Sequence, residues 1–418
     1  MNYKADLYIM LPCSSSSDIK LGIPYDDPSC PKDARLFMEE LSDRAGFEFD
    51  IELHKILKRY FLKEIVLRIE DDSGNDNLLD EKQKGFIVIA KSKRKHTSFC
   101  LLFVVIPNID DKYITDLFDQ VSRNEIKIIV DGEEPCLLKK YIKEKYELEI
   151  TGKAFTASCM TEPQREKEKE YRYLLSGETR NNPNSTIKSK HVDSLINENH
   201  AQYEEYALFL SDYCALCIMK EFNENDYKSR LKIECLLLFI MELVILKITA
   251  INSANNAIVN EFKDSENDNC SLVKIKEIAE KFVKSLPLWD TRNFKYFNAQ
   301  TEANKIEDSF RVPDYFNNYE KNLEHFENIA KIRDTLATEK EAKSFGRLTI
   351  IVSILALFQI VPLFFGLPRE RIIPYGITLL VAIMIVIICF YPKETIKKIG
   401  HLIKKIGCSI MRKTKRSR

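Results

Sequence analysis

Two long uncharged runs near the end of the chain constrain its fold more than any other feature. They cover residues 348–366 and 372–391, are 19 and 20 residues long, and are separated by only five residues. At about 1.5 Å per helical residue, each run reaches about 28–30 Å, which is the thickness of the hydrocarbon core of a bilayer. The pattern predicts two transmembrane helices that form a hairpin.

The basic residues around these runs predict an orientation. The chain has 63 Lys and Arg residues against 63 Asp and Glu residues, but residues 392–418 hold ten basic residues and one acidic residue. The tail therefore carries +9 and the rest of the chain −9. Lys340, Lys343 and Arg347 precede the first run. Because basic flanks stay on the cytoplasmic side, we expect a multi-pass protein of the inner (cytoplasmic) membrane with both termini in the cytoplasm.

The tail has a pattern of its own. Isoleucines recur in it at intervals of three and four residues, at Ile396, Ile399, Ile403, Ile406 and Ile410, with lysines between them. This spacing predicts a basic amphipathic helix in residues 392–418 that lies on the anionic lipid bilayer. The alternative is a disordered positive tail that only sets the topology.

Composition and missing motifs exclude several classes of protein. Zero net charge argues against direct nucleic-acid binding. Eleven unevenly spaced cysteines, without a secretory start, predict reduced thiols in the cytoplasm. No phosphate-binding loop or nucleophile elbow is present, so we expect no enzymatic activity. Cys214 and Cys217 have no second pair to complete a zinc site, and we expect them to be core residues of a helix rather than metal ligands.

The remaining patterns predict an α+β membrane protein with several parts. We expect a cytosolic α/β domain in residues 1–160, a linker in 161–191, a helical bundle in 192–311 and a stalk helix in 312–347, before the hairpin and the tail. The predicted strands of the first domain are 5–10, 64–69, 85–90, 99–107 and 126–129, and its predicted helices are 31–44, 50–61 and 111–123.

A third apolar stretch, residues 233–251, is interrupted by Glu234, Glu242 and Lys247. A central charge costs roughly 2.5–3.5 kcal/mol on insertion into a bilayer. We therefore expect a buried helix of the cytosolic part, and a third span is the alternative.

The stalk prediction depends on an unbroken helical segment. Residues 314–361 contain no proline, and Gly346 is their only glycine, so that one helix could run about 70 Å. A seam of apolar residues at intervals of three and four is formed by Phe316, Tyr319, Leu323, Phe326 and Ala330. This seam predicts packing against a copy or a neighbouring helix, as in an ordinary bundle.

The first run is more polar than the second, because it contains Thr349, Ser353 and Gln359. An amide in hydrocarbon needs a partner or water, which predicts a place inside a ring of subunits. The alternative is that Gln359 only bonds a neighbouring helix. The predicted pore-lining residues are Phe345, Leu348, Thr349, Val352, Ala356, Gln359 and Leu363, and the predicted pore mouth is Gly366, Arg369 and Arg371.

Two segments could meet a ligand of the nucleotide type. Lys93 and Arg94 lie in a basic run between two predicted strands, and an ordinary hairpin loop is the alternative. Trp289, Arg292 and Tyr296 offer stacking surfaces and charge, and aromatic core packing is the alternative.

The architecture resembles the CorA family of magnesium channels. The local likeness is Arg347-Leu348-Thr349-Ile350-Ile351 at the start of the first run and Tyr375-Gly376 at the start of the second. The resemblance implies a homopentamer whose first span lines an axial pore. CorA proteins end that span with Gly-Met-Asn, but here the stretch is Phe365-Gly366-Leu367-Pro368. Divergent relatives of this kind are associated with type III CRISPR systems, where they resemble membrane effectors switched by a nucleotide second messenger.

These expectations combine into one functional hypothesis and two alternatives. The hypothesis is a ligand-gated, homo-oligomeric membrane pore of antiviral defence that requires no cofactor and is switched by a small nucleotide. The alternatives are a divalent-cation transporter for Mg²⁺ and a membrane-tethered binding adaptor without a pore.

Overall fold

The structure is a computed structural model that describes most of the chain up to Phe365. The described residues are 4–15, 22–49, 57–68, 83–92, 99–110, 113–114, 117, 120–121, 125–161, 198–220, 226–264, 272–286 and 290–365. The chain divides into two compact units, Met1–Glu327 and Asn328–Arg418. All described strands lie in the first unit.

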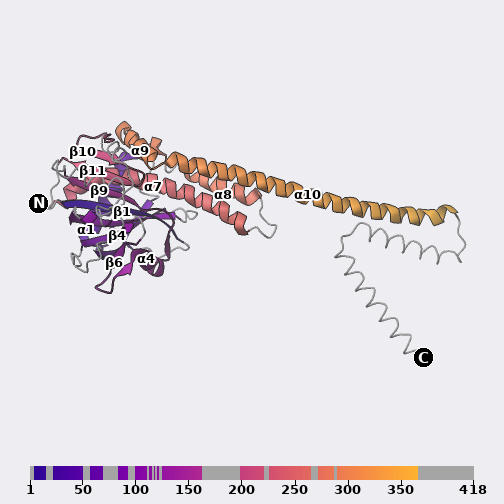
Figure 1. Cartoon of the computed structure of the whole chain (residues 1–418), viewed down its shortest axis with the longest axis horizontal. Helices are drawn as coiled ribbons and strands as arrows, with labels where there is room; N and C mark the ends of the chain where they lie inside the picture. Colours follow the sequence, from indigo (N-terminus) through magenta and orange to yellow (C-terminus); the bar gives the residue numbers. More distant parts are fainter. Residues whose placement is uncertain are drawn as a thin grey trace, which may run out of the picture. The chain divides into compact units, whose positions relative to one another are not determined.

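The first unit is built on an eleven-stranded sheet (Figure 1). Its strands are β1 (Lys4–Ser15), β2 (Ile23–Pro24), β3 (Leu57–Arg68), β4 (Gln83–Ser92), β5 (Phe99–Asp110), β6 (Lys127–Ile129), β7 (Cys136–Leu137), β8 (Leu148–Ile150), β9 (Phe155–Thr161), β10 (Tyr206–Leu210) and β11 (Cys214–Met219). The order is β10-β11-β9-β1-β5-β4-β3-β6-β7, with β2 on β3 and β8 on β1. The described pairs are antiparallel except β9 with β11, which are parallel.

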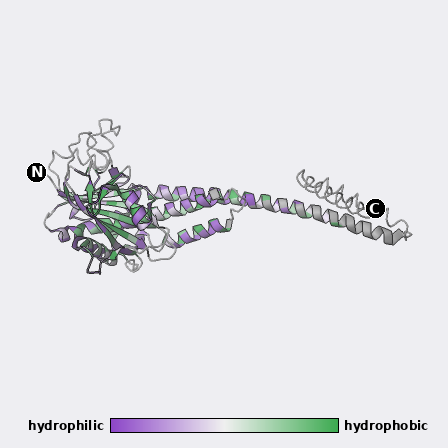
Figure 2. Cartoon of the chain, turned by 90° about the horizontal axis from the view of Figure 1, so that it is seen from below, coloured by the Kyte–Doolittle hydropathy of each residue, from purple (hydrophilic) through white to green (hydrophobic). Residues whose placement is uncertain are grey.

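The central strands are buried on both faces. Along β4, Val88 belongs to one hydrophobic core, while its neighbours Ile87 and Ile89 belong to the other. Successive strand residues point to opposite faces, so that a strand covered on both sides reads as a continuous apolar run. The strands are accordingly mostly green in Figure 2.

Helices cover both faces of this sheet. The described helices are α1 (Lys32–Glu48), α4 (Leu138–Tyr146), α7 (Tyr227–Asp264), α8 (Leu272–Ser285), α9 (Phe297–Ser309) and α10 (Val312–Phe365), with a short 3-10 turn, η4 (Thr291–Asn293). Apolar residues of α1, α7 and α9 belong to the first core, and residues of α4 belong to the second. Both cores therefore lie within the first unit.

Helix α1 follows directly from local sequence. Pro31 precedes it, and its buried residues recur at helical spacing at Ala34, Phe37, Met38, Leu41 and Ala45. Phe37 packs against Tyr8 of β1 and Phe103 of β5. The helix predicted for 31–44 is confirmed, and α1 continues one turn further to Glu48.

Helix α7 is the buried helix that the third apolar stretch predicts. Its charged residues are compensated where they meet the sheet. The Arg230 Nε donates to Asp6 Oδ2 at 2.7 Å, and both side chains are buried. Tyr8 donates to Glu234, and Arg59 of β3 pairs with Glu242. A buried charge needs such partners, so that these contacts fix where α7 lies on the sheet.

Several secondary-structure predictions are wrong. The segment 206–219 forms β10 and β11, not part of a helical bundle, and Cys214 and Cys217 are strand residues. The prediction that these two cysteines are buried is confirmed. The helix predicted for 50–61 is also wrong in its described part, because residues from Leu57 on belong to β3. In β11 the reason is that five of its six residues are buried, so that the strand has no alternation of apolar and polar residues.

Helix α10 is continuous from Val312 to Phe365. Within the first unit, Phe316, Tyr319, Leu323 and Phe326 pack against the first core. Tyr319 contacts Phe282 of α8, with ring centroids 4.6 Å apart. α7, α8 and the start of α10 run side by side in both views (Figures 1 and 2). This part of the seam is therefore the face of an ordinary bundle helix.

The predicted membrane architecture needs correction. Across the part of the chain that the structure describes, no helix offers a stretch that is both long enough and apolar enough for a bilayer. This finding contradicts the α+β membrane fold class, the transmembrane hairpin, the pore and the membrane location. The second predicted span, the pore mouth at Gly366, Arg369 and Arg371, and the tail lie outside the described residues.

The prediction depends on two uncharged runs of the sequence, and the structure describes only the first of them, as the end of helix α10. Helix α10 carries charged residues in nearly every turn from Asp314 to Arg347. Helix α7 is more apolar, but it carries buried glutamates and packs on the sheet. The fold is an α+β protein with a large mixed sheet.

Candidate ligand-binding pocket

A pocket of about 400 Å³ lies where four segments of the first unit meet. The end of α1, the segment that leads into β10, the first turns of α7 and the start of α9 each contribute to its wall. The lining residues are Arg44, Phe47, Glu48, Tyr203, Glu205, Tyr206, Lys232, Ile233, Leu236, Tyr296 and Asn298. Its volume is in the range of small-molecule sites.

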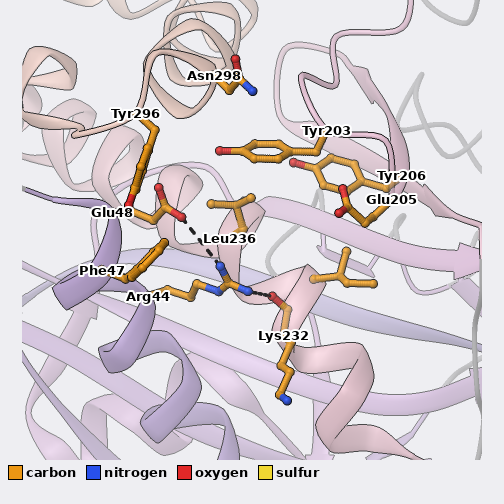
Figure 3. Close-up of a pocket in the computed structure, with 11 residues that line it drawn as sticks. Arg44, Phe47, Glu48, Tyr203, Glu205, Tyr206, Lys232, Leu236, Tyr296 and Asn298 are labelled. Carbon is orange, nitrogen blue, oxygen red and sulfur yellow. Dashed lines mark hydrogen bonds and ion pairs between the residues drawn. The ribbon is translucent and has the colours of Figure 1, made fainter.

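Two stacked aromatic pairs dominate the pocket (Figure 3). The rings of Phe47 and Tyr296 are 5.4 Å apart at 27°, and those of Tyr203 and Tyr206 are 6.1 Å apart at 26°. In the close-up the first pair lies on the left and the second on the right, with Leu236 between them. Such flat apolar faces are suited to stacking with a planar ring.

Charged groups of both signs accompany these rings. Arg44 donates from Nη2 to the backbone oxygen of Lys232 at 2.7 Å, and its Nη1 lies 3.7 Å from Glu48 Oε1. The side chain of Lys232 points away from the aromatic pairs in Figure 3. Glu205 adds an exposed carboxylate at the rim. The pocket therefore offers a guanidinium and a carboxylate side by side.

The second oxygen of Glu48 differs from the first. The Glu48 side chain is buried, and its Oε2 has no hydrogen-bond partner among the described residues. Burial raises the pKa of Glu48, whereas the positive charges of Arg44 and Lys295 lower it. Figure 3 shows the carboxylate between the two aromatic pairs.

The backbone holds the first aromatic pair in place. Phe49, just after α1, forms an isolated antiparallel bridge with Phe294. Lys295 donates from its backbone nitrogen to the backbone oxygen of Glu48 at 2.8 Å, and its Nζ donates to the backbone oxygen of Gly46 at 3.0 Å. These bonds bring Tyr296 next to Phe47, although about 250 residues separate them in sequence.

The second aromatic pair is held by a buried carboxylate. Glu302 of α9 accepts from the Tyr206 hydroxyl at 2.5 Å and from the Gln202 backbone nitrogen at 3.1 Å. Burial raises the pKa of Glu302 to about 7, and the two hydrogen bonds oppose that rise. Burial also raises the pKa of Tyr203 and of Tyr206. Both tyrosines are therefore neutral hydroxyls at physiological pH.

One of the predicted ligand residues lines this pocket. Tyr296 does so, as part of the first aromatic pair. Arg292 is highly exposed and pairs with Asp290 through two hydrogen bonds of 3.0 Å from its Nε. Trp289, Lys93 and Arg94 lie outside the described residues.

The predicted pore-lining residues all lie on helix α10. Phe345, Thr349 and Val352 are exposed side chains on α10. Leu348, Ala356, Gln359 and Leu363 belong to the same helix, and their side chains are outside what is described.

Sequence reasoning missed most of the pocket. Arg44 was expected to end its helix, and Phe47 and Glu48 were not expected to be helical. Tyr203 and Tyr206 fall in a segment with a wrong helical prediction. The available signal was the aromatic spacing in Tyr203-Glu-Glu-Tyr206, but nothing in one sequence relates it to residue 47 or 296. No group of three or more possible metal ligands occurs within the described ranges.

Comparisons with known proteins add no relative. No family model matches the chain, and no curated protein or solved structure matches it. The resemblance to CorA proteins therefore stays a prediction that depends on the residues quoted above.

Proposed function

We propose that the chain is a ligand-binding sensor protein whose pocket takes a small planar ligand of the nucleoside or nucleotide type. The observation that carries this proposal is the pair of aromatic stacks around one pocket, beside Arg44 and Glu48. A nucleobase supplies a flat ring for stacking and polar edges for hydrogen bonds. Arg44 lines the same pocket, and its guanidinium would bind a phosphate of the ligand.

The charge of the pocket restricts the ligand. Two basic and two acidic residues line it, namely Arg44 and Lys232 against Glu48 and Glu205. A polyphosphate would need more positive charge, so that a nucleoside or a ligand with few phosphates is favoured. A mainly aromatic, mixed-charge wall is typical of small-molecule sites.

Helix α9 connects the pocket to helix α10, so that it could transmit ligand binding along the chain. Its first turn contributes Asn298 to the pocket, and Glu302 holds Tyr206 one turn further on. Only Phe310 and Arg311 separate α9 from α10, and Arg311 has a left-handed backbone conformation with a φ of 56°. A ligand that prefers one arrangement of α9 would shift the population of that arrangement, and the start of α10 would follow.

The test is direct binding by calorimetry with nucleoside monophosphates as probes, together with substitutions that remove one ring. We expect Tyr296→Ala and Phe47→Ala each to weaken binding by about tenfold, because stacking of a base on an aromatic ring contributes about 1–3 kcal/mol. Phe297→Ala is the matched control, since this ring is 77% exposed and does not line the pocket. Equal loss in all three variants, or no binding of any probe, would contradict the proposal.

Homo-oligomerisation, the absence of enzymatic activity and a place in CRISPR-associated antiviral defence stay predictions from sequence. The genes beside this one would decide the last of them, and a mass measurement of the purified chain would decide the first.

A further inference from the structure

Among the described residues that line the pocket, Glu48 is the one with a buried side-chain atom that has no hydrogen-bond partner. Its side chain is 3% exposed, and its Oε2 has no hydrogen-bond partner in the described chain. A buried acceptor without a donor costs about 1–3 kcal/mol, and a charged one costs more. Buried acceptors in folded proteins nearly always have a hydrogen-bond donor. Because Glu48 lines the pocket, a bound ligand is the donor that we consider.

The hydrogen-bond donors around Glu48 are bonded to other acceptors. The other oxygen, Oε1, already lies 3.7 Å from Arg44 Nη1, and Arg44 is in turn committed to the backbone oxygen of Lys232. Lys295 uses its Nζ on the Gly46 oxygen. None of these donors is hydrogen-bonded to Oε2, so that this oxygen is left to accept a hydrogen bond from a ligand.

We propose that Glu48 is the specificity-determining residue of the pocket, and that its Oε2 accepts a hydrogen bond from an amino group on the edge of a planar ligand ring. This inference rests on the proposed function, since it names the ligand class for the same pocket. The ligand is an amino-bearing purine, such as adenine or guanine, stacked on the aromatic pairs. A ring that lacks the amino group leaves the buried oxygen unpaired and binds more weakly.

The position of Glu48 supports this geometry. Phe47 precedes it on α1, so that the carboxylate and one stacking ring leave the same turn of the same helix. Figure 3 shows the carboxylate between the Phe47 and Tyr296 pair and the Tyr203 and Tyr206 pair. A ring stacked on either pair would therefore present its edge to Glu48. Burial strengthens such a charge-assisted hydrogen bond, because water competes less for it.

The experiment compares matched nucleotides with the full chain by calorimetry. AMP is paired with purine riboside 5′-monophosphate, which lacks the 6-amino group, and GMP is paired with IMP, which lacks the 2-amino group. We expect the amino-bearing member of at least one pair to bind about tenfold more tightly or better, as loss of a charge-assisted hydrogen bond predicts. This comparison uses the unaltered protein, so that it does not depend on how any variant folds.

Two variants then assign the preference to Glu48. Glu48→Leu has similar volume but no acceptor, and we expect its preference to fall below about threefold. Glu204→Gln alters an exposed carboxylate that does not line the pocket, and we expect it to keep the preference. Equal affinities within both pairs, or a preference that survives in Glu48→Leu, would overturn the role of Glu48 and leave the proposed function standing. No binding of any of the four nucleotides would overturn the proposed function and this inference together.

Discussion

Glu302 joins the pocket to the helical part of the first unit through one carboxylate. One oxygen accepts from Tyr206, a pocket residue of β10, and the other accepts from the Gln202 backbone. The side chain is fully buried, which raises its pKa to about 7, from an ordinary value near 4.5. The carboxyl group that holds the second aromatic pair therefore gains and loses its proton within the physiological pH range.

This pKa predicts a pH dependence of stability whose sign follows from linkage. The folded state holds the Glu302 proton more tightly than the unfolded state, so that its contribution is fully present below about pH 4.5 and is lost as pH rises through about 7. Between pH 5.5 and 8 the loss amounts to about 2 kcal/mol. Glu302→Gln cannot titrate and does not have this loss.

Urea unfolding of both proteins at the two pH values measures the effect. The quantity of interest is the change in unfolding free energy of the wild type minus that of Glu302→Gln, because other titrating groups cancel in this difference. A difference near zero would show that Glu302 keeps an ordinary pKa in the folded chain.

At the scale of elements, the sequence predicts helices with one buried face better than strands with two. Helix α1 and the buried α7 were recognisable because their apolar residues recur at helical spacing or form one long run. In contrast, β11 places Cys217 in the first core and its neighbour Leu216 in the second. Both neighbours are apolar, so that the alternation that identifies a strand is absent.

The packing of α8 against α10 gives a prediction at this scale. Phe282 of α8 is 5% exposed and contacts Tyr319 and Phe316 of α10. We expect Phe282→Ala to lower the free energy of unfolding by about 3–5 kcal/mol, since it removes a buried ring. Val283→Ala, at the next residue of the same helix and 58% exposed, is expected to change it by less than about 0.5 kcal/mol. Denaturant titration of both variants checks this, and similar losses in the two would mean that the contact is not a stabilising one.

At the scale of the whole molecule, the pocket shows why a site is harder to predict than its elements. Its wall comes from four segments, around residues 44–48, 203–206, 232–236 and 296–298. The backbone bridge between Phe49 and Phe294 brings two of these segments together, and only tertiary structure creates it. Tyr296 could be singled out by its aromatic neighbours, but its partner Phe47 could not. The prediction of a membrane pore used only uncharged runs of the sequence and no tertiary contact.

The division of the chain into two units leads to a last prediction. Described members of both hydrophobic cores, and the residues that pack on them, end at Phe326, one residue before the end of the first unit. A chain that ends at Glu327 therefore keeps every described member of the two hydrophobic cores and the whole pocket, and loses one buried apolar side chain, that of Ala330. We expect it to melt within about 3 °C of the full chain and to bind the same nucleotide with unchanged affinity.

A chain that ends at Phe310 is the control, because it also loses Tyr319, which is 3% exposed against the core. We expect its melting temperature to fall by about 5 °C or more. Calorimetric melting of the two truncated chains separates these outcomes, and unfolding of the longer one would mean that residues beyond Glu327 stabilise the first unit.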